Sequence, residues 1–163
     1  MSGRGTPEGQ QVDGSGLSVA VVGTQWHPQV SDALVEHAVA AVHDCGATLG
    51  TVVRVPGAFE VPLLAQALAA THDAVIALAV IIRGGTPHFE YVSDAVTTGC
   101  TRVALDTGVP VGFGVLTCDT DEQAIARSGL PGSEEDKGRE ATLAAIETAV
   151  LLREVRGGTR AGF

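Results

Sequence analysis

One short segment of the chain combines groups that could bind a phosphate and transfer a proton. RGGTPH (83–88) follows a continuously apolar run and precedes a long helical pattern. Two glycines let backbone N–H groups turn toward a ligand, and the pattern predicts Thr86 as N-cap and Pro87 as the first helical residue. Free N–H groups at a helix start attract anions, and a neutral His88 beside a bound phosphate could transfer a proton. The alternative is a tight turn with His88 as an ordinary surface residue.

Two other positions could hold a flat ligand that carries hydroxyl groups. In PGAFEVP (56–62), proline and glycine fix a turn, and the Glu60 carboxylate could accept hydrogen bonds from ligand hydroxyls. Trp26, the only tryptophan, follows an early β-rich run and could stack on a heterocycle. Structural roles stay open: Glu60 as a first-turn acid, which the sequence alone favours, Phe59 as a core residue, and Trp26 as a plug at a helix end.

Two cations in the last third of the chain are candidate phosphate ligands. The planar fork of Arg127 suits phosphate oxygens, and Lys137 is a similar candidate, although a lone surface cation is more often solvated. The chain has no P-loop, and its GFG triplet (112–114) falls inside a predicted strand, so no dinucleotide motif is present. The histidines lack metal-ligand spacing, and we expect no metal. Three scattered cysteines without CxxC indicate reduced intracellular thiols.

The segments that must position these groups alternate between strand-like and helix-like patterns. Ala74–Ile82 is apolar throughout, as expected for a strand covered on both faces. The alternation predicts a flavodoxin-like three-layer α/β/α sandwich with a four-stranded parallel sheet. Ligands of such sheets bind beyond the carboxyl ends of the strands, where the candidate groups lie. Strands are predicted at 17–22, 48–55, 74–82 and 109–116, and helices at 28–44, 61–70, 87–107, 119–128 and 136–156.

Length and charge limit the domain organisation and the partners. The 163 residues suggest one domain at 17–156, with flexible tails at 1–16 and 157–163. A net charge of -9 without a Lys or Arg run argues against nucleic acid and anionic membranes as partners. No apolar run reaches membrane-spanning length, and the N-terminus lacks the apolar block of a signal peptide. We therefore expect a cytoplasmic protein.

The last predicted helix has an unusual pattern. It is apolar nearly all round from Ala141 to Leu152. A helix of this kind is buried on more than one face. The extra face is either a subunit interface or part of the chain's own core, and the pattern alone does not separate the two.

Taken together, these segments resemble the lumazine synthase family of riboflavin biosynthesis. The segments 56–62 (PGAFEVP) and 82–92 (IRGGTPHFEYV) look like the two signature stretches of the family, and the second is highly specific. The resemblance extends from about Leu17 to Arg156. It departs from the family at Gly85, often a bulkier or polar residue, and at Glu90, usually Asp. Further similar segments are TQWH at 24–27, GFGVLT at 112–117, DEQAIARSG at 121–129 and EDKG at 135–138.

The resemblance implies a transferase with two small-molecule substrates and no cofactor. It would condense 5-amino-6-(D-ribitylamino)uracil with L-3,4-dihydroxy-2-butanone 4-phosphate to 6,7-dimethyl-8-ribityllumazine, phosphate and water. The catalytic proton donor would be His88. The uracil substrate would be bound by Trp26, Ala58, Phe59, Glu60, Val80, Ile81, Ile82 and Phe113. The phosphate would be bound by Gly85, Thr86, Arg127 and Lys137.

The resemblance also implies a homo-oligomer whose site takes Phe113, Arg127 and Lys137 from a neighbouring subunit. We expect a homopentamer rather than the larger shell that some members form, because the connection 129–137 contains three consecutive acids that would repel across a symmetric contact. Riboflavin synthase is a candidate partner. Two other functions remain possible alternatives: a non-catalytic flavin- or lumazine-binding flavodoxin-like module, and a shell-forming assembly protein. The segment 23–27 does not match the Ser/Thr-rich phosphate loop of a flavodoxin.

Overall fold

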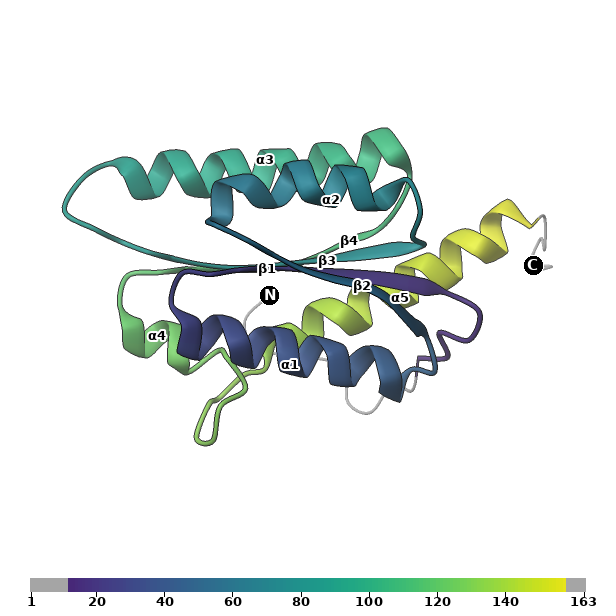
Figure 1. The fold of residues 1–163 in the computed structure, drawn as a ribbon, viewed down its shortest axis with the longest axis horizontal. Helices are drawn as coiled ribbons and strands as arrows, with labels where there is room; N and C mark the ends of the chain where they lie inside the picture. Colours follow the sequence, from purple (N-terminus) through teal and green to yellow (C-terminus); the bar gives the residue numbers. More distant parts are fainter. Residues whose placement is uncertain (1–11, 158–163) are drawn as a thin grey trace, which may run out of the picture.

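Four parallel strands form the middle layer of the computed structural model, which describes residues 12–157 (Figure 1). β3 is central, and its residues from Ala74 to Ile81 are all buried, as the uninterrupted apolar run predicts. The predicted three-layer, flavodoxin-like architecture with four parallel strands is confirmed. The strands are β1 (Ser18–Thr24), β2 (Thr48–Val55), β3 (Ala74–Ile82) and β4 (Val111–Cys118), in the spatial order β2-β1-β3-β4.

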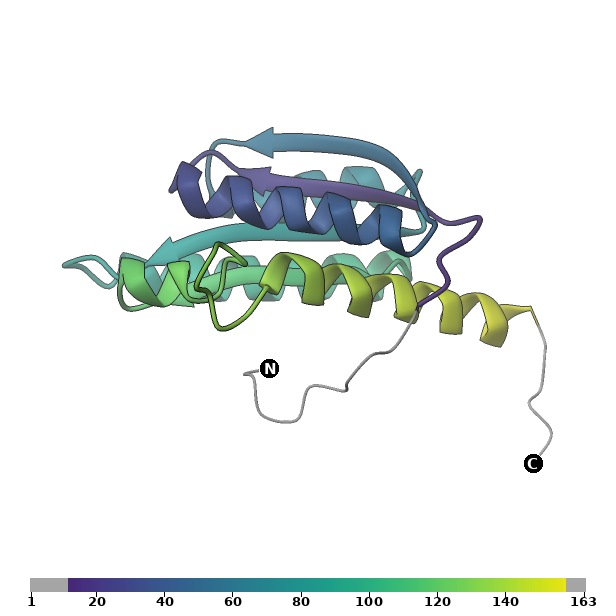
Figure 2. The same cartoon turned by 90° about the horizontal axis from the view of Figure 1, so that it is seen from below.

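Helices cover both faces of the sheet and enclose two separate clusters of apolar side chains (Figures 1 and 2). Successive residues of a strand point to opposite faces, so Ile76 and Leu78 enter one cluster while Ala77 and Ala79 enter the other. One face is covered by α2 (Val61–Ala69) and α3 (His88–Thr107), and the other by α1 (Pro28–Asp44), α4 (Asp121–Ile125) and α5 (Lys137–Arg156).

The predicted bounds of the helix at 119–128 are wrong at both ends, because hydrogen bonds from flanking side chains set where the helix begins and ends. Thr120 is the N-cap, and its Oγ1 accepts a hydrogen bond from the Gln123 N–H at 3.3 Å. Beyond Ile125, the hydroxyls of Ser128 and Ser133 both donate to the Ile125 carbonyl, at 2.8 Å and 2.5 Å. These bonds replace further helical turns, so α4 is short.

The folded unit begins earlier than the predicted boundary at residue 17. The Gly14 N–H donates to the Cys45 carbonyl at 2.7 Å, and Arg153 donates to the Ser15 carbonyl at 3.2 Å. Gly14 is buried, and a Cβ there would lie 2.9 Å from the Ile146 side chain. Residues 12–16 therefore pack on the domain, while the predicted tails 1–11 and 158–163 lie outside the described residues.

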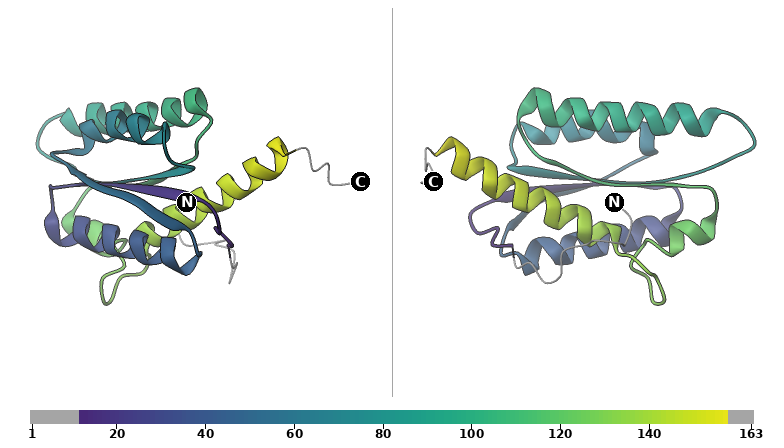
Figure 3. Two further views of the ribbon diagram at one scale, coloured as in Figure 1. Left: turned by 45° about the vertical axis from the view of Figure 1, so that its right-hand side comes forward. Right: turned by 180° about the vertical axis from the view of Figure 1, so that it is seen from behind.

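Helix α5 buries only one face within a single chain. Ala141, Ala145, Ile146 and Ala149 pack against the sheet and α1. On the other side, the exposed fraction of Leu151 is 53%. The C-terminal end of α5 extends beyond the sheet (Figure 3). Across residues 12–157, no helix is long and apolar enough to cross a membrane.

Candidate active site

A cleft of about 350 Å³ opens beyond the carboxyl ends of the strands, where the sequence predicts a ligand. Its volume lies in the usual range for small-molecule sites. The turn after β1, the segment after β2, the end of β3 and the start of α3 all contribute to it. The predicted residues that line it are Trp26, Ala58, Phe59, Glu60, Val80, Ile81, Ile82, Thr86 and His88.

A second cavity of about 380 Å³ lies at the opposite end of the sheet, near the starts of β1, β3 and β4. The two arginines that line it donate hydrogen bonds to main-chain carbonyls. Arg156 donates to the Gly108 carbonyl at 2.8 Å and Arg153 to that of Ser15 at 3.2 Å. These arginines tie the end of α5 to neighbouring segments, so the first cleft is the better candidate for chemistry.

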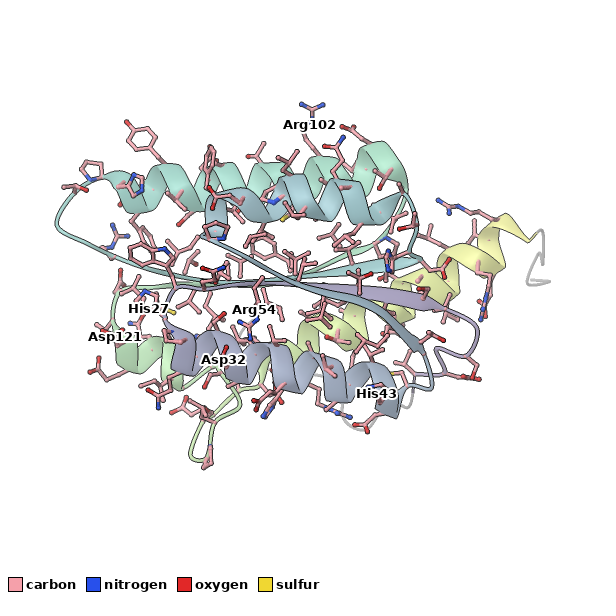
Figure 4. The ribbon with its side chains drawn as sticks, viewed as in Figure 1. His27, Asp32, His43, Arg54, Arg102 and Asp121 are labelled. Atoms are coloured by element: carbon pink, nitrogen blue, oxygen red, sulfur yellow. The ribbon has the colours of Figure 1, made fainter. Side chains whose placement is uncertain are left out.

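The turn between β1 and α1 presents an aromatic ring at the mouth of the cleft. The exposed fraction of Trp26 is 67%, which contradicts the alternative that it plugs a helix end. His27 follows it in the left-handed conformation, with φ of 52°. The His27 Nδ1 lies 3.7 Å from an oxygen of Asp121, the first residue of α4 (Figure 4). The pair connects the β1–α1 turn to the segment after β4.

The segment after β2 presents a carboxylate and a second exposed ring to the cleft. Ala58–Glu60 forms a 3-10 helix, and Glu60 is also the N-cap residue of α2. The Gly57 N–H donates to the Glu60 Oε2 at 2.9 Å, which fixes the carboxylate and leaves its other oxygen for a ligand. The exposed fraction of Phe59 is 64%, so the alternative that it is a core residue is wrong.

The predicted capping of α3 differs from the structure by one residue. Pro87, not Thr86, is the N-cap, and α3 begins at His88. Pro87 has no N–H to donate, and its φ of -63° already suits the helix start. Thr86 is thereby left in the preceding loop, where it lines the cleft with Gly84. His88 stands at the first helical position with an exposed side chain.

Arg83 anchors the base of the 83–88 loop through three partners. Its Nε donates to Asp119 at 2.7 Å, its Nη1 donates to Glu90, and its guanidinium lies 4.2 Å from the centre of the Phe89 ring. The hydrogen bond from Arg83 lowers the pKa of the Glu90 carboxyl. At the tip of the loop, a Cβ added at Gly84 or Gly85 would meet nothing within 4 Å. The loop is fixed at its base and open at its tip.

Phe113, Arg127, Lys137 and Gly85 are predicted site residues that do not line the cleft within the described chain. Phe113 lies in β4 opposite Ala77 of β3. Val80, the first residue of β3 that lines the cleft, is three residues further on, which is roughly 10 Å along the strand. Its neighbours Gly112 and Gly114 face α5, so the Phe113 ring points to the other face, where it is 45% exposed. The fold therefore keeps this ring away from its own cleft.

The 125–137 connection brings the two predicted phosphate-binding cations together. The Lys137 N–H donates to the Arg127 carbonyl at 3.0 Å. The Glu135 carboxylate lies between the two side chains, 2.9 Å from the Lys137 Nζ and 4.0 Å from the Arg127 Nε. Arg127 also donates to the Gln123 carbonyl at 2.8 Å. Both cations are thus held on one structured connection that follows α4.

Neither a metal cluster nor a reactive thiol is seen in the part of the chain that the structure describes. No group of three or more His, Cys, Asp or Glu side chains is arranged to hold a metal among residues 12–157. The three cysteines are buried and unpaired. Burial raises the pKa of the Cys100 thiol to about 11, so this group is a neutral thiol at physiological pH. The absence of a metal requirement stays a prediction.

Comparison with known proteins decides the family. A sequence model described as 6,7-dimethyl-8-ribityllumazine synthase matches residues 16–153, nearly the whole folded unit. The chain belongs to the lumazine synthase family. It is 61% identical over 156 residues to the 6,7-dimethyl-8-ribityllumazine synthase of Kineococcus radiotolerans, with 95% of this chain and 96% of the relative covered. It is 60% identical over 156 residues to that of Frankia casuarinae, with 95% and 98% covered.

The structure shows how the two departures from the lumazine synthase pattern, Gly85 and Glu90, are accommodated. Gly85 lies at the open tip of its loop, so a larger side chain would fit there without a clash inside the chain. Glu90 uses its longer side chain to reach Arg83, which Asp119 binds from the other side. Neither departure removes a side chain that lines the cleft. The side chains that line the cleft are therefore the same with or without these departures.

Several residues of the cleft were not predicted from the sequence. His27 belongs to the TQWH segment, and its position next to Trp26 at the end of a strand was an available signal. Phe89 and Val92 look like core positions of a helix, so their types carry no chemical signal. Gly57 and Gly84 lie in the two turns that the sequence marks as candidate ligand sites. The lining residues that the sequence does not single out as ligand contacts are His27, Gly57, Phe89 and Val92, whereas Gly84 belongs to the glycine pair expected to turn toward a ligand.

Proposed function

We propose that this cleft performs the lumazine synthase reaction, the condensation of 5-amino-6-(D-ribitylamino)uracil with L-3,4-dihydroxy-2-butanone 4-phosphate. The chain is a member of an enzyme family named for the product, 6,7-dimethyl-8-ribityllumazine. The observation that carries the assignment to this cleft is the meeting of Trp26, Glu60 and the start of α3 around it. These groups match a flat ring, a chain of hydroxyls and a phosphate in turn.

The exposed edge of β3 supports binding of the uracil ring. β1 pairs with β3 only as far as Ala77, whereas β4 pairs with it up to Ile82. On the β1 side, the main-chain groups of 80–82 therefore have no strand partner among the described residues, and these residues line the cleft. Backbone N–H and C=O groups in this setting can pair with the alternating donors and acceptors of a uracil edge. Trp26 would stack on the ring, and Glu60 with Ala58 and Phe59 would hold the ribityl chain.

The start of α3 supports binding of the phosphate substrate. The first N–H groups of a helix have no partners within it, and the helix dipole favours an anion there. The glycine-rich loop lets the phosphate approach the Gly85 and Thr86 backbone closely. His88 would donate the proton during imine formation and phosphate loss. Because the reaction joins two bound molecules, most of the acceleration would come from positioning them and stabilising the leaving phosphate.

A neighbouring subunit would complete this site with Phe113, Arg127 and Lys137. The proposal is supported by the position of these residues outside their own cleft and by the exposure of Phe113. The partly exposed second face of α5 offers apolar surface for an interface. Phe113 would close over the heterocycle, and the two cations would bind the phosphate. We place this oligomer in the cytoplasm, with riboflavin synthase as a candidate partner.

Incubation with both substrates tests the proposed activity. Lumazine absorbance should rise together with release of inorganic phosphate, in equal amounts, after exhaustive chelation and without an added cofactor. Omission of either substrate should abolish the absorbance change. A chain that binds lumazine or flavin but forms no product would instead support the non-catalytic alternative.

Replacing His88 with alanine should lower kcat by about 10-fold and leave the enzyme active. General acid–base groups typically contribute ~10²–10⁴-fold, but the exposed position of this ring lets water take over part of the proton transfer. Steady-state kinetics with both substrates would measure the effect. His43, exposed near the end of α1, gives the matched control His43→Ala, which should keep full activity. Equal kcat values for His88→Ala and the parent would remove the proton-donor assignment.

The oligomer should be a homopentamer of about 83 kDa, the ring size that the resemblance to the lumazine synthase family implies. Head-to-tail contacts close into such a ring when they complete a rotation. Of the three consecutive acids in the 129–137 connection, only Glu134 is exposed, because Glu135 pairs with Lys137 and Asp136 with His37. The repulsion that would disfavour a further contact between rings therefore rests on Glu134. Mass photometry in dilute buffer would give the distribution. A dominant species many times heavier than five chains would contradict the pentamer.

A further inference from the structure

The guanidinium of Arg54 joins three segments that are separate in the sequence. Arg54 lies near the end of β2, and its Nη1 donates to the Thr24 carbonyl and to the Ser31 Oγ, both at 3.0 Å. Its Nη2 donates to Asp32 at 2.7 Å. Figure 4 shows Arg54 and Asp32 facing each other between the sheet and α1. One side chain thus links the end of β2, the end of β1 and the first turn of α1.

The position of Thr24 makes this link relevant to the cleft. Its carbonyl also accepts a hydrogen bond from the Ser31 hydroxyl at 2.5 Å, and both residues are only 1% exposed. The next residue, Gln25, donates its N–H to the Val55 carbonyl at 3.0 Å. Trp26 follows directly. The main chain leading to the exposed Trp26 ring is therefore held by a partly buried network, although the ring itself is open to solvent.

Two backbone features show how closely the turn is fitted to its surroundings. Gly23 has no room for a side chain, because a Cβ there would lie 2.6 Å from Val35 and 3.2 Å from the Arg54 side chain. His27 is the one non-glycine residue with positive φ among residues 12–157. Such a conformation is uncommon and persists where the surroundings hold it in place. Removing the Arg54 bonds would let the turn relax toward other conformations and move the Trp26 ring.

We infer that Arg54 is a positioning residue for the reaction: it acts through Thr24 and Ser31 to hold Trp26 as a preformed platform for the uracil ring. The inference rests on the proposed function and deepens it. A preformed ring lowers the cost of binding, because no side chain or loop has to be ordered when the substrate arrives. Loss of the network should therefore weaken uracil binding and leave the phosphate side of the site intact.

Arg54→Met and Arg54→Lys test the inference in the full chain. Met keeps the length of the side chain but none of the donors, whereas Lys keeps the charge and can reach only part of the network. We expect KM for the uracil substrate to rise about 5-fold in Arg54→Met and less in Arg54→Lys, with kcat and KM for the phosphate substrate unchanged. The control is Arg102→Met, because Arg102 is 75% exposed on α3 and pairs with Asp106 in its own helix (Figure 4).

Fluorescence provides a second measurement that does not require activity. Trp26 is the only tryptophan, so time-resolved anisotropy of the chain reports its motion alone. The fast component should grow in both Arg54 variants and stay unchanged in Arg102→Met. Equal changes in KM for both substrates, or an unchanged anisotropy decay in a folded Arg54 variant, would overturn the inference. An inactive parent chain would refute the proposed function instead, and the anisotropy result would still decide whether Arg54 holds the ring.

Discussion

Replacing Gly138 with alanine should lower the free energy of unfolding by about 3 kcal/mol or more. A Cβ at this position would lie 2.3 Å from the Leu34 carbonyl oxygen and 3.0 Å from the Leu34 Cα, both main-chain atoms of α1. The helices cannot avoid this contact by rotating a side chain, so α5 would have to move away from α1. That movement would open the buried cluster around Ile146 and Leu34.

Helix propensity alone predicts that Gly138→Ala raises the free energy of unfolding, so the sign of the measured change separates the two effects. An Ala in place of a Gly inside a helix normally stabilises it by roughly 0.5–1 kcal/mol. Thermal unfolding at a fixed protein concentration should show a fall in Tm of about 10 °C. Gly85→Ala is the stability control, since the same methyl group would meet nothing within 4 Å there. A Tm at or above that of the parent would show that α1 and α5 are not packed as described.

Arg127→Ala should raise KM for the phosphate substrate by about 100-fold. A hydrogen bond to a charged group is worth about 1.5–3 kcal/mol, and a guanidinium can offer two parallel bonds to one phosphate. The same connection presents Lys137 beside Arg127, which should keep some affinity. Because the lost interaction is with the phosphate alone, KM for the uracil substrate should change little.

The result can be separated from a general loosening of the 125–137 connection. Arg127 also donates to the Gln123 carbonyl, so its removal takes away this hydrogen bond within the connection as well as the positive charge. Arg127→Lys keeps the charge without the fork, and it should restore part of the affinity. Inhibition by inorganic phosphate should weaken in parallel with the change in KM. If KM for the phosphate substrate stayed at the parent value, Arg127 would not be a phosphate ligand.

Much of the fold and the cleft could be predicted because local patterns carry them. Pro28–Asp44, Thr48–Val55 and Ala74–Ile82 have the predicted bounds, since their apolar periodicity agrees with their burial. The cleft lies at the carboxyl ends of the strands, and the topology alone predicts that position. Trp26 and Glu60 could be named because their types are chemically distinctive and directly follow strands.

The features that the sequence did not reveal depend on contacts between distant residues. The end of α4 is set by Ser133, eight residues beyond Ile125, and the start of the folded unit by the contact of Gly14 with Cys45. From the sequence, Arg54 looks like an ordinary polar residue of a strand, and only the structure shows its hydrogen bond to the Thr24 carbonyl. No periodicity encodes such pairs, so they became visible only with the three-dimensional arrangement.

Co-expression of two defective chains tests most directly whether one subunit's cleft is completed by the next subunit's 125–137 connection. One chain would carry Trp26→Ala with His88→Ala in the cleft, and the other Arg127→Ala. Neither oligomer alone should be efficient. In hybrids isolated through two different tags, random assembly should give about a quarter of the sites an intact cleft and an intact connection from different chains. We predict that lumazine formation recovers to about a quarter of the parent rate. Activity equal to the average of the two defective enzymes would contradict a shared site.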